Sequence, residues 1–140
     1  MSLYKTILVT LEGTPTDRAI IEHVKVLAHS MQSRVVLLHV ATGVPAKYHR
    51  TDAAGKEVEE SKAFLNRVRD EFVAAGVSAE AQLAYGEPAK EIVTWVQRNG
   101  CDLVAMSTHG HKFVADLVLG TTAIKVQHSI SVPVLLLRAK

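Results

Sequence analysis

Short aliphatic runs alternate with longer segments of helical periodicity along the chain, and this alternation limits the possible folds more than any other feature. The runs are rich in β-branched and aliphatic residues and predict strands, whereas the segments between them repeat apolar residues at helical spacing and predict helices. The predicted order is therefore βαβαβαβαβ. The predicted strands cover Tyr4–Leu11, Arg34–Ala41, Val77–Gly86, Cys101–Ser107 and Val132–Arg138.

The predicted helices have recognisable starts and stops. The segment Thr14–Ser30 opens with a capping threonine followed by proline, Lys56–Ala75 is followed by glycine, and Glu87–Asn99 opens with Glu-Pro. A fourth helix reaches Gln127. Between the second strand and the second helix, Thr42–Gly55 lacks periodicity and carries glycine and proline, which predicts a surface loop.

Strands that alternate with helices of this length predict an α/β fold with a doubly wound, five-stranded parallel sheet covered on both faces. A length of 140 residues fits one domain, residues 1–140. With 48% hydrophobic and 21% charged residues, the composition excludes a disordered chain. The net charge of +2 is spread without a basic block, which argues against a nucleic-acid partner.

The sequence also indicates whether the protein contacts a membrane and in which cellular compartment it lies. We find no apolar run of membrane length and no signal peptide, so no membrane partner is expected. Cys101 is the only cysteine, which suits a reducing compartment. Both observations predict a cytoplasmic protein.

Two loops have the composition of a binding site. In doubly wound sheets, ligands bind beyond the carboxyl ends of the strands, where the winding reverses. The segments Thr10–Thr14, after the first strand, and Ser107–His111, after the fourth, both occupy such ends. We expect a site between them.

The stretch Met106–Thr122 combines glycines with Ser/Thr residues and is the strongest candidate for phosphate binding. A phosphate needs converging N–H donors, which a turn leading into a helix supplies, and Gly110 permits a close backbone approach. Gly120 lies inside a helical pattern, where glycine costs roughly 1 kcal/mol relative to alanine. Either the helix breaks there, so that Gly120 and Thr121 begin a new helical segment facing the phosphates, or the glycine only allows close packing.

Five segments together resemble the universal stress protein family over essentially the whole chain. They are "ILVTLEGT", "LLHV", "GEPAKEIV", "CDLVAMSTHG" and "LGTTAIKVQHSISVPVLLL". The resemblance implies a Rossmann-like fold of the adenine nucleotide alpha hydrolase-like type. It also implies a stress-response or regulatory protein, a homodimer joined through the last strand at about Val132–Leu137, and a signalling partner protein that it does not identify.

Nucleotide-binding members of the family carry a glycine, two residues, a second glycine, nine residues, and then glycine followed by serine or threonine. The matching positions here are Ser107, Gly110, Gly120 and Thr121. Serine replaces the first glycine, so this residue is strained if the position needs a positive φ, or else its hydroxyl contacts a phosphate. Glu12 stands where aspartate is usual, and Thr10 where proline is common.

The resemblance implies that the chain binds ATP, ADP or AMP, with or without Mg²⁺. The alternative is a nucleotide-free dimeric interaction module of the same family, in which Ser107 and Glu12 mark a disused site. The residues expected at the nucleotide are Thr10, Leu11, Glu12, Gly13, Val40, Met106, Ser107, His109, Gly110, His111, Lys112, Gly120, Thr121 and Thr122.

The remaining reactive side chains favour binding over catalysis. His109 and His111 make a poor metal pair because alternate residues in a turn rarely converge, so we expect no metal site of their making. His39, inside an apolar run, is expected to be a hydrogen-bonded core residue, and Cys101 an inert one. Asp116 and Glu12 are candidate bases or magnesium ligands, but an exposed helical aspartate is usually only solvated. The chain also has no P-loop motif, so we expect a protein that is not an enzyme, with any ATP hydrolysis slow.

Overall fold

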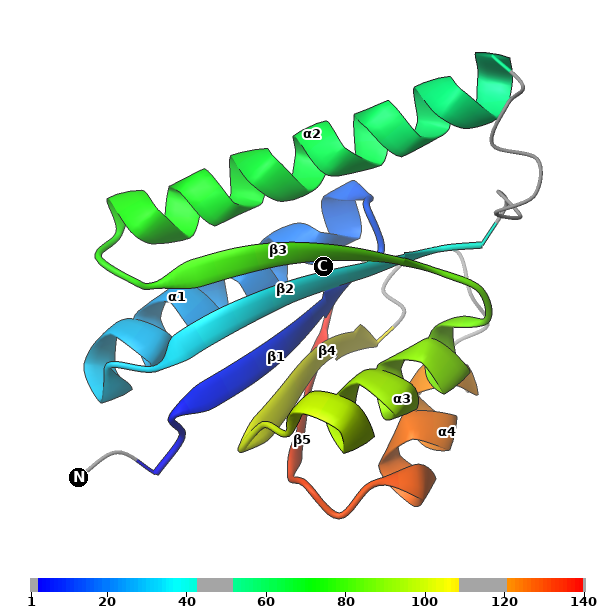
Figure 1. Ribbon diagram of the computed structural model, residues 1–140. Coiled ribbons are helices and arrows are strands. Elements are labelled where there is room, and N and C mark those ends of the chain that lie inside the picture. Colours follow the sequence, from blue (N-terminus) through cyan, green and yellow to red (C-terminus); the bar gives the residue numbers. More distant parts are fainter. Residues whose placement is uncertain (1–2, 43–51, 109–120, 140) are drawn as a thin grey trace.

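The computed structural model describes residues 3–42, 52–108 and 121–139. Within these ranges, five strands form one parallel sheet in the order β3-β2-β1-β4-β5, and helices join consecutive strands (Figure 1). The predicted doubly wound α/β fold is confirmed. The strands are β1 (Thr6–Leu11), β2 (Arg34–Ala41), β3 (Ala79–Tyr85), β4 (Leu103–Thr108) and β5 (Val134–Arg138).

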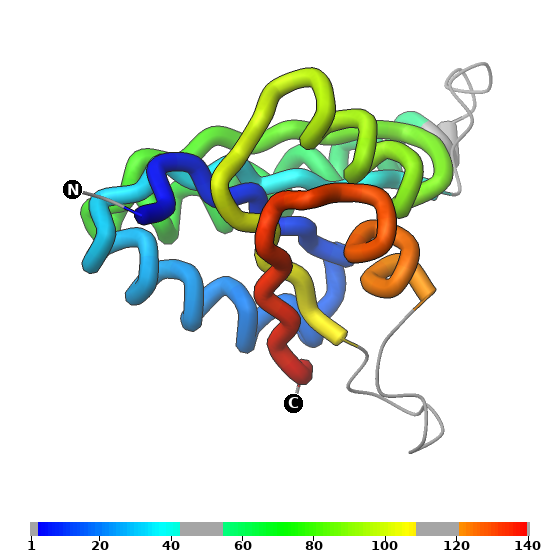
Figure 2. The backbone as a smooth tube through the Cα atoms, turned by 90° about the horizontal axis from the view of Figure 1, so that it is seen from below, coloured from blue at the N-terminus to red at the C-terminus, as the bar shows by residue number. Residues whose placement is uncertain are grey.

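Helices cover both faces of this sheet. The described helices are α1 (Arg18–Met31), preceded by the short 3-10 helix η1 (Pro15–Asp17), α2 (Asp52–Ala74), α3 (Pro88–Asn99) and α4 (Thr121–Ser129). In Figure 2, α1 and α3 lie on opposite sides of β1. Among the described residues, no helix has both the length and the apolar composition of a membrane span.

Two apolar cores result from the alternation of side chains along the strands. On one face, Ile7 and Val9 of β1 pack with buried residues of α1 and α2, among them Phe72. On the other face, Leu8 of β1 packs with residues of α3 and α4, among them Ile92. The central strand β1 is therefore buried on both sides, as a parallel sheet requires.

The winding of the sheet reverses at β1. This strand pairs with β2 on one side and with β4 on the other, and both partners are parallel to it. The chain first adds β2 and β3 outward, then returns to place β4 and β5 on the opposite side. The carboxyl ends of β1 and β4 thus flank the position where a doubly wound sheet places its ligand.

Several predicted boundaries are wrong by a few residues. Helix α2 begins at Asp52, so the last part of the predicted loop Thr42–Gly55 is helical, and residues 43–51 lie outside the described residues. Strand β1 begins at Thr6, two residues later than predicted. Cys101 precedes β4 and does not begin it, and Val132 likewise precedes β5. Both are apolar residues that pack on the α3/α4 core without joining the sheet ladder.

Further boundary corrections concern β3, the start of α1 and two elements that extend past their predicted ends, β4 to Thr108 and α4 to Ser129. Strand β3 is shorter at both ends than the predicted Val77–Gly86. The segment that begins at Thr14 opens as the 3-10 helix η1 before it becomes α-helical at Arg18. The expected position of β3 near an edge of the sheet is confirmed.

Candidate functional site

A cavity of about 360 Å³ lies at the carboxyl ends of β1, β2 and β4. Its walls combine strand-end residues with residues from the beginnings of α3 and α4. The volume is within the range of small-molecule sites in proteins. Seven of the residues predicted from the sequence line it: Thr10, Leu11, Glu12, Val40, Met106, Ser107 and Thr122.

The other predicted residues lie elsewhere or outside the described part of the chain. Gly13 borders two neighbouring hollows on the outer side of the β1 turn, and Thr121 begins α4 next to the lining residue Thr122. Five further residues lie outside the described ranges: His109, Gly110, His111, Lys112 and Gly120. The candidate base Asp116 also lies outside them.

Several lining residues were not expected from the sequence. His39 of β2 lines the cavity, as do Glu57 of α2 and Pro88 and Ile92 of α3. His39 is hydrogen-bonded, as predicted, but it is only half-buried and lines the cavity. The position of Pro88 could have been found from the sequence, because it begins α3 and is separated by two residues from the end of β3, at the same edge of the sheet.

Ser107 lines the cavity, and its hydroxyl is unpaired within the described residues. It belongs to β4 and pairs in register with Leu137 of β5, so its backbone is extended. Within the described residues, Gln32 alone among non-glycine residues has a positive φ, so the strain considered for serine at this position does not arise. The Oγ atom of Ser107 is buried and has no hydrogen-bond partner in the described part of the chain. A buried hydroxyl without a partner is costly and rare in native proteins.

The turn after β1 is held by a buried carboxylate. Asp17 is 1% exposed and accepts N–H bonds from Glu12, at 2.9 and 3.1 Å, and from Gly13, at 2.7 Å. A longer bond of 3.3 Å comes from the N–H of Thr14. Burial raises the pKa of the Asp17 carboxyl, and the bonds from these three N–H groups act against that rise. The N–H donors of this turn are thus used internally and do not face the cavity.

The described lining of the cavity is acidic. Glu12 and Glu57 line it, whereas no lysine or arginine does so among the residues that the structure describes. The same residues form no cluster of three or more His, Cys, Asp or Glu side chains able to hold a metal ion. Cys101 is half-buried away from this lining, and burial raises the pKa of its thiol to about 11, which keeps it protonated and unreactive at neutral pH.

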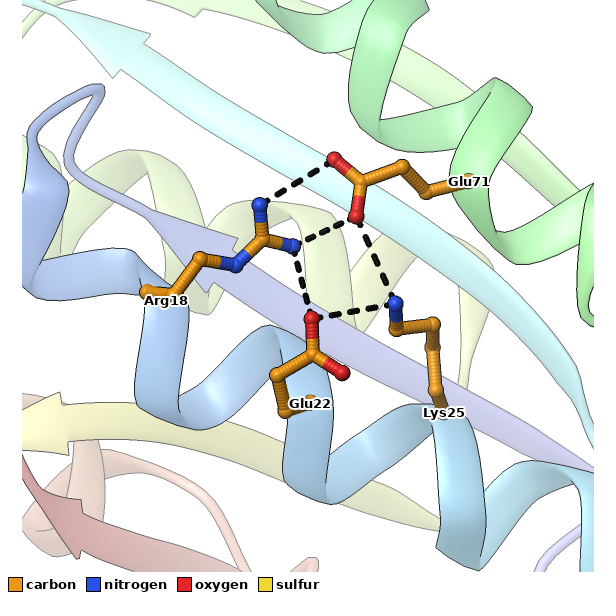
Figure 3. Close-up of polar contacts among 4 residues, drawn as sticks. All are labelled: Arg18, Glu22, Lys25 and Glu71. Carbon is orange, nitrogen blue, oxygen red and sulfur yellow. Dashed lines mark hydrogen bonds and ion pairs between the residues drawn. The ribbon is translucent and has the colours of Figure 1, made fainter.

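A charged network on the surface joins the beginning of α1 to α2 (Figure 3). The Arg18 guanidinium donates two bonds to the Glu71 carboxylate, at 2.5 and 3.2 Å. Lys25 approaches both Glu71, at 3.4 Å, and Glu22, at 3.0 Å. Because Arg18 directly follows Asp17, this network tethers the β1 turn to α2.

Comparison with known proteins identifies the fold and the family. The family model described as "Universal stress protein family" matches residues 3–138. The chain belongs to the universal stress protein family. Universal stress protein A homolog 2 of Coxiella burnetii is 30% identical to it over 151 residues, which span 100% of this chain and 99% of that protein.

Solved universal stress protein structures share this architecture. The structure of MJ0577, a universal stress protein of Methanocaldococcus jannaschii, has a TM-score of 0.86 at 26% identity and covers 99% of this chain and 98% of its own. A universal stress protein in complex with cAMP has a TM-score of 0.75 at 17% identity, with 98% of each chain covered. A universal stress protein of Archaeoglobus fulgidus in complex with dAMP has a TM-score of 0.71 at 16% identity, covering 96% of this chain and 98% of that one.

Proposed function

We propose that this universal stress protein binds an adenine nucleotide, ATP, ADP or AMP, in the cavity at the carboxyl ends of β1 and β4. The observation that carries the proposal is a cavity at the point where the winding reverses, one of whose lining residues, Ser107, has a buried hydroxyl without a described partner. A bound ligand would supply the missing hydrogen bond. Relatives of the same fold in complex with cAMP and dAMP support an adenine nucleotide as this ligand.

The charges around the cavity favour one orientation of the bound nucleotide. The carboxylates of Glu12 and Glu57 repel phosphates, and carboxylate oxygens accept hydrogen bonds from ribose hydroxyls or from the amino group of a base. We therefore propose that the nucleoside lies on the β1/β2 side, above apolar residues such as Val40.

We propose that the phosphates lie on the opposite side of the cavity. Ser107 lies there at the end of β4, and Thr122 lies in the first described turn of α4, where N–H groups and the helix dipole favour an anion. Lys112 and the histidines on either side of Gly110 remain predicted phosphate contacts. Mg²⁺ would accompany a triphosphate, and this also remains a prediction.

A thermal-shift titration with AMP, ADP and ATP, each with and without Mg²⁺, tests the proposal. A ligand that binds only the native state raises the melting temperature with concentration. We expect such a rise, with Ser107→Ala weakening binding roughly three- to tenfold through loss of one hydrogen bond. The absence of a shift at millimolar nucleotide would favour the nucleotide-free module.

Ser33→Ala is the matched control for Ser107→Ala. Ser33 is buried, 3% exposed, and its hydroxyl donates to the Tyr4 carbonyl at the amino end of the sheet. Its loss should lower stability and leave nucleotide affinity unchanged. Ser107→Ala should weaken nucleotide binding and leave stability unchanged, because the Ser107 hydroxyl has no partner within the described chain.

We further propose a homodimer formed through β5. This strand lies at an edge of the sheet, and its apolar residues from Val134 to Leu137 are only partly buried. A bare apolar edge favours pairing with a second chain, and pairing between two copies of β5 is isologous. Light scattering should give a dimer for the native chain and a monomer for Leu136→Lys, while Tyr85→Lys at the other edge, on β3, should remain dimeric.

We propose a regulatory role in the cytoplasm for this nucleotide binding, rather than catalysis. Occupancy of the cavity would shift the population of conformations that a partner protein recognises. We expect phosphate release from ATP to be slow, and a single-turnover assay with excess protein measures it. A rate in the range of ordinary enzymes, about 1 s⁻¹ or above, would contradict the proposal.

A further inference from the structure

The turn after β1 has an unusual internal support. The buried Asp17 side chain receives the N–H groups of Glu12, Gly13 and Thr14, so one carboxylate fixes three consecutive backbone units. Successive N–H groups of a turn often bind an external anion. Here the chain supplies that anion itself, at 1% exposure.

His39 supports the same turn from the neighbouring strand. Its Nδ1 atom lies 2.8 Å from the carbonyl oxygen of Leu11, the residue with which it is in register between β1 and β2. The imidazole also covers Gly13, since a Cβ added there would lie 3.3 Å from its Cε1 atom. The backbone from Leu11 to Thr14 is therefore held by Asp17 and by His39.

Glu12 has little support of its own. Its side chain is exposed, and its one described hydrogen bond is a long contact of 3.5 Å from the Thr16 hydroxyl. The place of its carboxylate at the cavity thus follows from the backbone that Asp17 holds. Removal of the Asp17 carboxylate would release the turn and with it the Glu12 side chain.

We infer that Asp17 is a positioning residue of the nucleotide site, which acts on the ligand through Glu12. This inference rests on the proposed function, because it assigns Glu12 the contact with the nucleoside. Asp17 itself is separated from the cavity by the turn and does not line it. Its effect on affinity is indirect and needs Glu12 to be present.

A double-mutant cycle on AMP affinity tests the inference. The variants are Asp17→Asn, Glu12→Gln and the double variant, each titrated with AMP by calorimetry. Asparagine has the size of aspartate, but its NH₂ group cannot accept the N–H bonds of the turn. We expect each single variant to weaken AMP binding by about tenfold, and the double variant to be no weaker than either single one, within about twofold.

Asp102→Asn is the matched control. The Asp102 carboxylate accepts the N–H groups of Lys5 and Thr6, at 2.9 and 2.8 Å, at the amino end of the same strand. The same substitution there removes the same kind of contact far from the cavity, so it should lower stability and leave AMP affinity unchanged. If Asp17→Asn fails to fold, Asp17→Ser retains a hydroxyl acceptor for the turn and should bind AMP with intermediate affinity.

The outcomes separate this inference from the proposed function. If the native chain binds AMP and Asp17→Asn binds it equally well, Asp17 only stabilises the fold and the inference is wrong. If the losses multiply in the double variant, Asp17 does not act through Glu12 and the inference is again wrong. If the native chain binds none of AMP, ADP and ATP, the proposed function fails and this inference fails with it.

Discussion

The two ends of strand β1 are fixed by the same chemistry with different consequences. At the amino end, the exposed Asp102 carboxylate accepts the N–H groups of Lys5 and Thr6. At the carboxyl end, the buried Asp17 carboxylate accepts those of Glu12, Gly13 and Thr14. Only the second contact shapes a wall of the cavity. A carboxylate that caps a parallel strand can therefore serve stability alone, or stability together with a binding site, depending on which end of the strand it holds.

The largest difference between the two ends should appear in stability. Asp17→Asn places an NH₂ group against buried N–H donors, so we expect a loss of about 1–3 kcal/mol of unfolding free energy. Asp102→Asn, at an exposed position, should cost about 0.5–1.5 kcal/mol. Urea denaturation measures both values. An equal loss at the two ends would remove the distinction between the buried and the exposed contact.

Two glycines differ in the space that an added side chain would have. Gly13 and Gly100 both have positive φ, +82° and +78°, but a Cβ at Gly13 would meet His39 whereas one at Gly100 would meet no atom within 4 Å. Gly100→Ala should cost about 1 kcal/mol from backbone strain alone, and Gly13→Ala about 1–2 kcal/mol. Thermal and urea unfolding of the two variants give the difference. Equal losses of unfolding free energy would show that the His39 side chain does not hinder a Cβ at position 13.

The smallest expected effect concerns the surface network beside the carboxyl-end turn. The bond from Arg18 lowers the pKa of Glu71. The stability that this gives is therefore present above the ordinary glutamate pKa and is lost as the pH falls through the lowered value. Since Arg18 and Glu71 are 53% and 36% exposed, we expect Glu71→Gln to cost at most about 0.5 kcal/mol at pH 7.

The pH dependence of Glu71→Gln provides its check. The difference in unfolding free energy between the native chain and the variant should shrink as the pH falls from 7 to about 3. Glu59→Gln, an exposed position on the same helix, is the control and should show no such trend. If the difference in unfolding free energy between the native chain and Glu71→Gln grows as the pH falls, the ion pair with Arg18 does not stabilise the protein.

Much of the fold followed from the sequence because buried strands carry a strong apolar signal. The bounds of β2 were predicted correctly, since the consecutive residues Val35–Leu38 all pack in one of the two cores. The predicted strand bounds were wrong where an apolar residue is buried but does not pair with a neighbouring strand. Cys101 and Val132 are apolar because they pack on helices, but they lie outside the ladder. Gly55, taken as a mark of a loop, lies in the first turn of α2.

The candidate site was predictable only in part. Thr10, Val40 and Ser107 could be placed together because the carboxyl ends of neighbouring parallel strands meet at one edge of the sheet. Glu57 could not, because its approach depends on how the long helix α2 crosses the sheet. The capping threonine Thr14 was visible in the sequence, but the bonds that Asp17 accepts from the N–H groups of Glu12 and Gly13 depend on the conformation of the turn.

A residue-by-residue NMR titration of the amide signals with AMP shows directly where the nucleotide binds. If the nucleotide binds at the carboxyl end of the sheet, the signals of Thr10, Val40, Ser107 and Thr122 should shift and saturate together. The signals of Lys5 and Thr6, at the amino end of β1, should stay in place. No shift at millimolar AMP, or a shift centred on the amino end, would contradict the account.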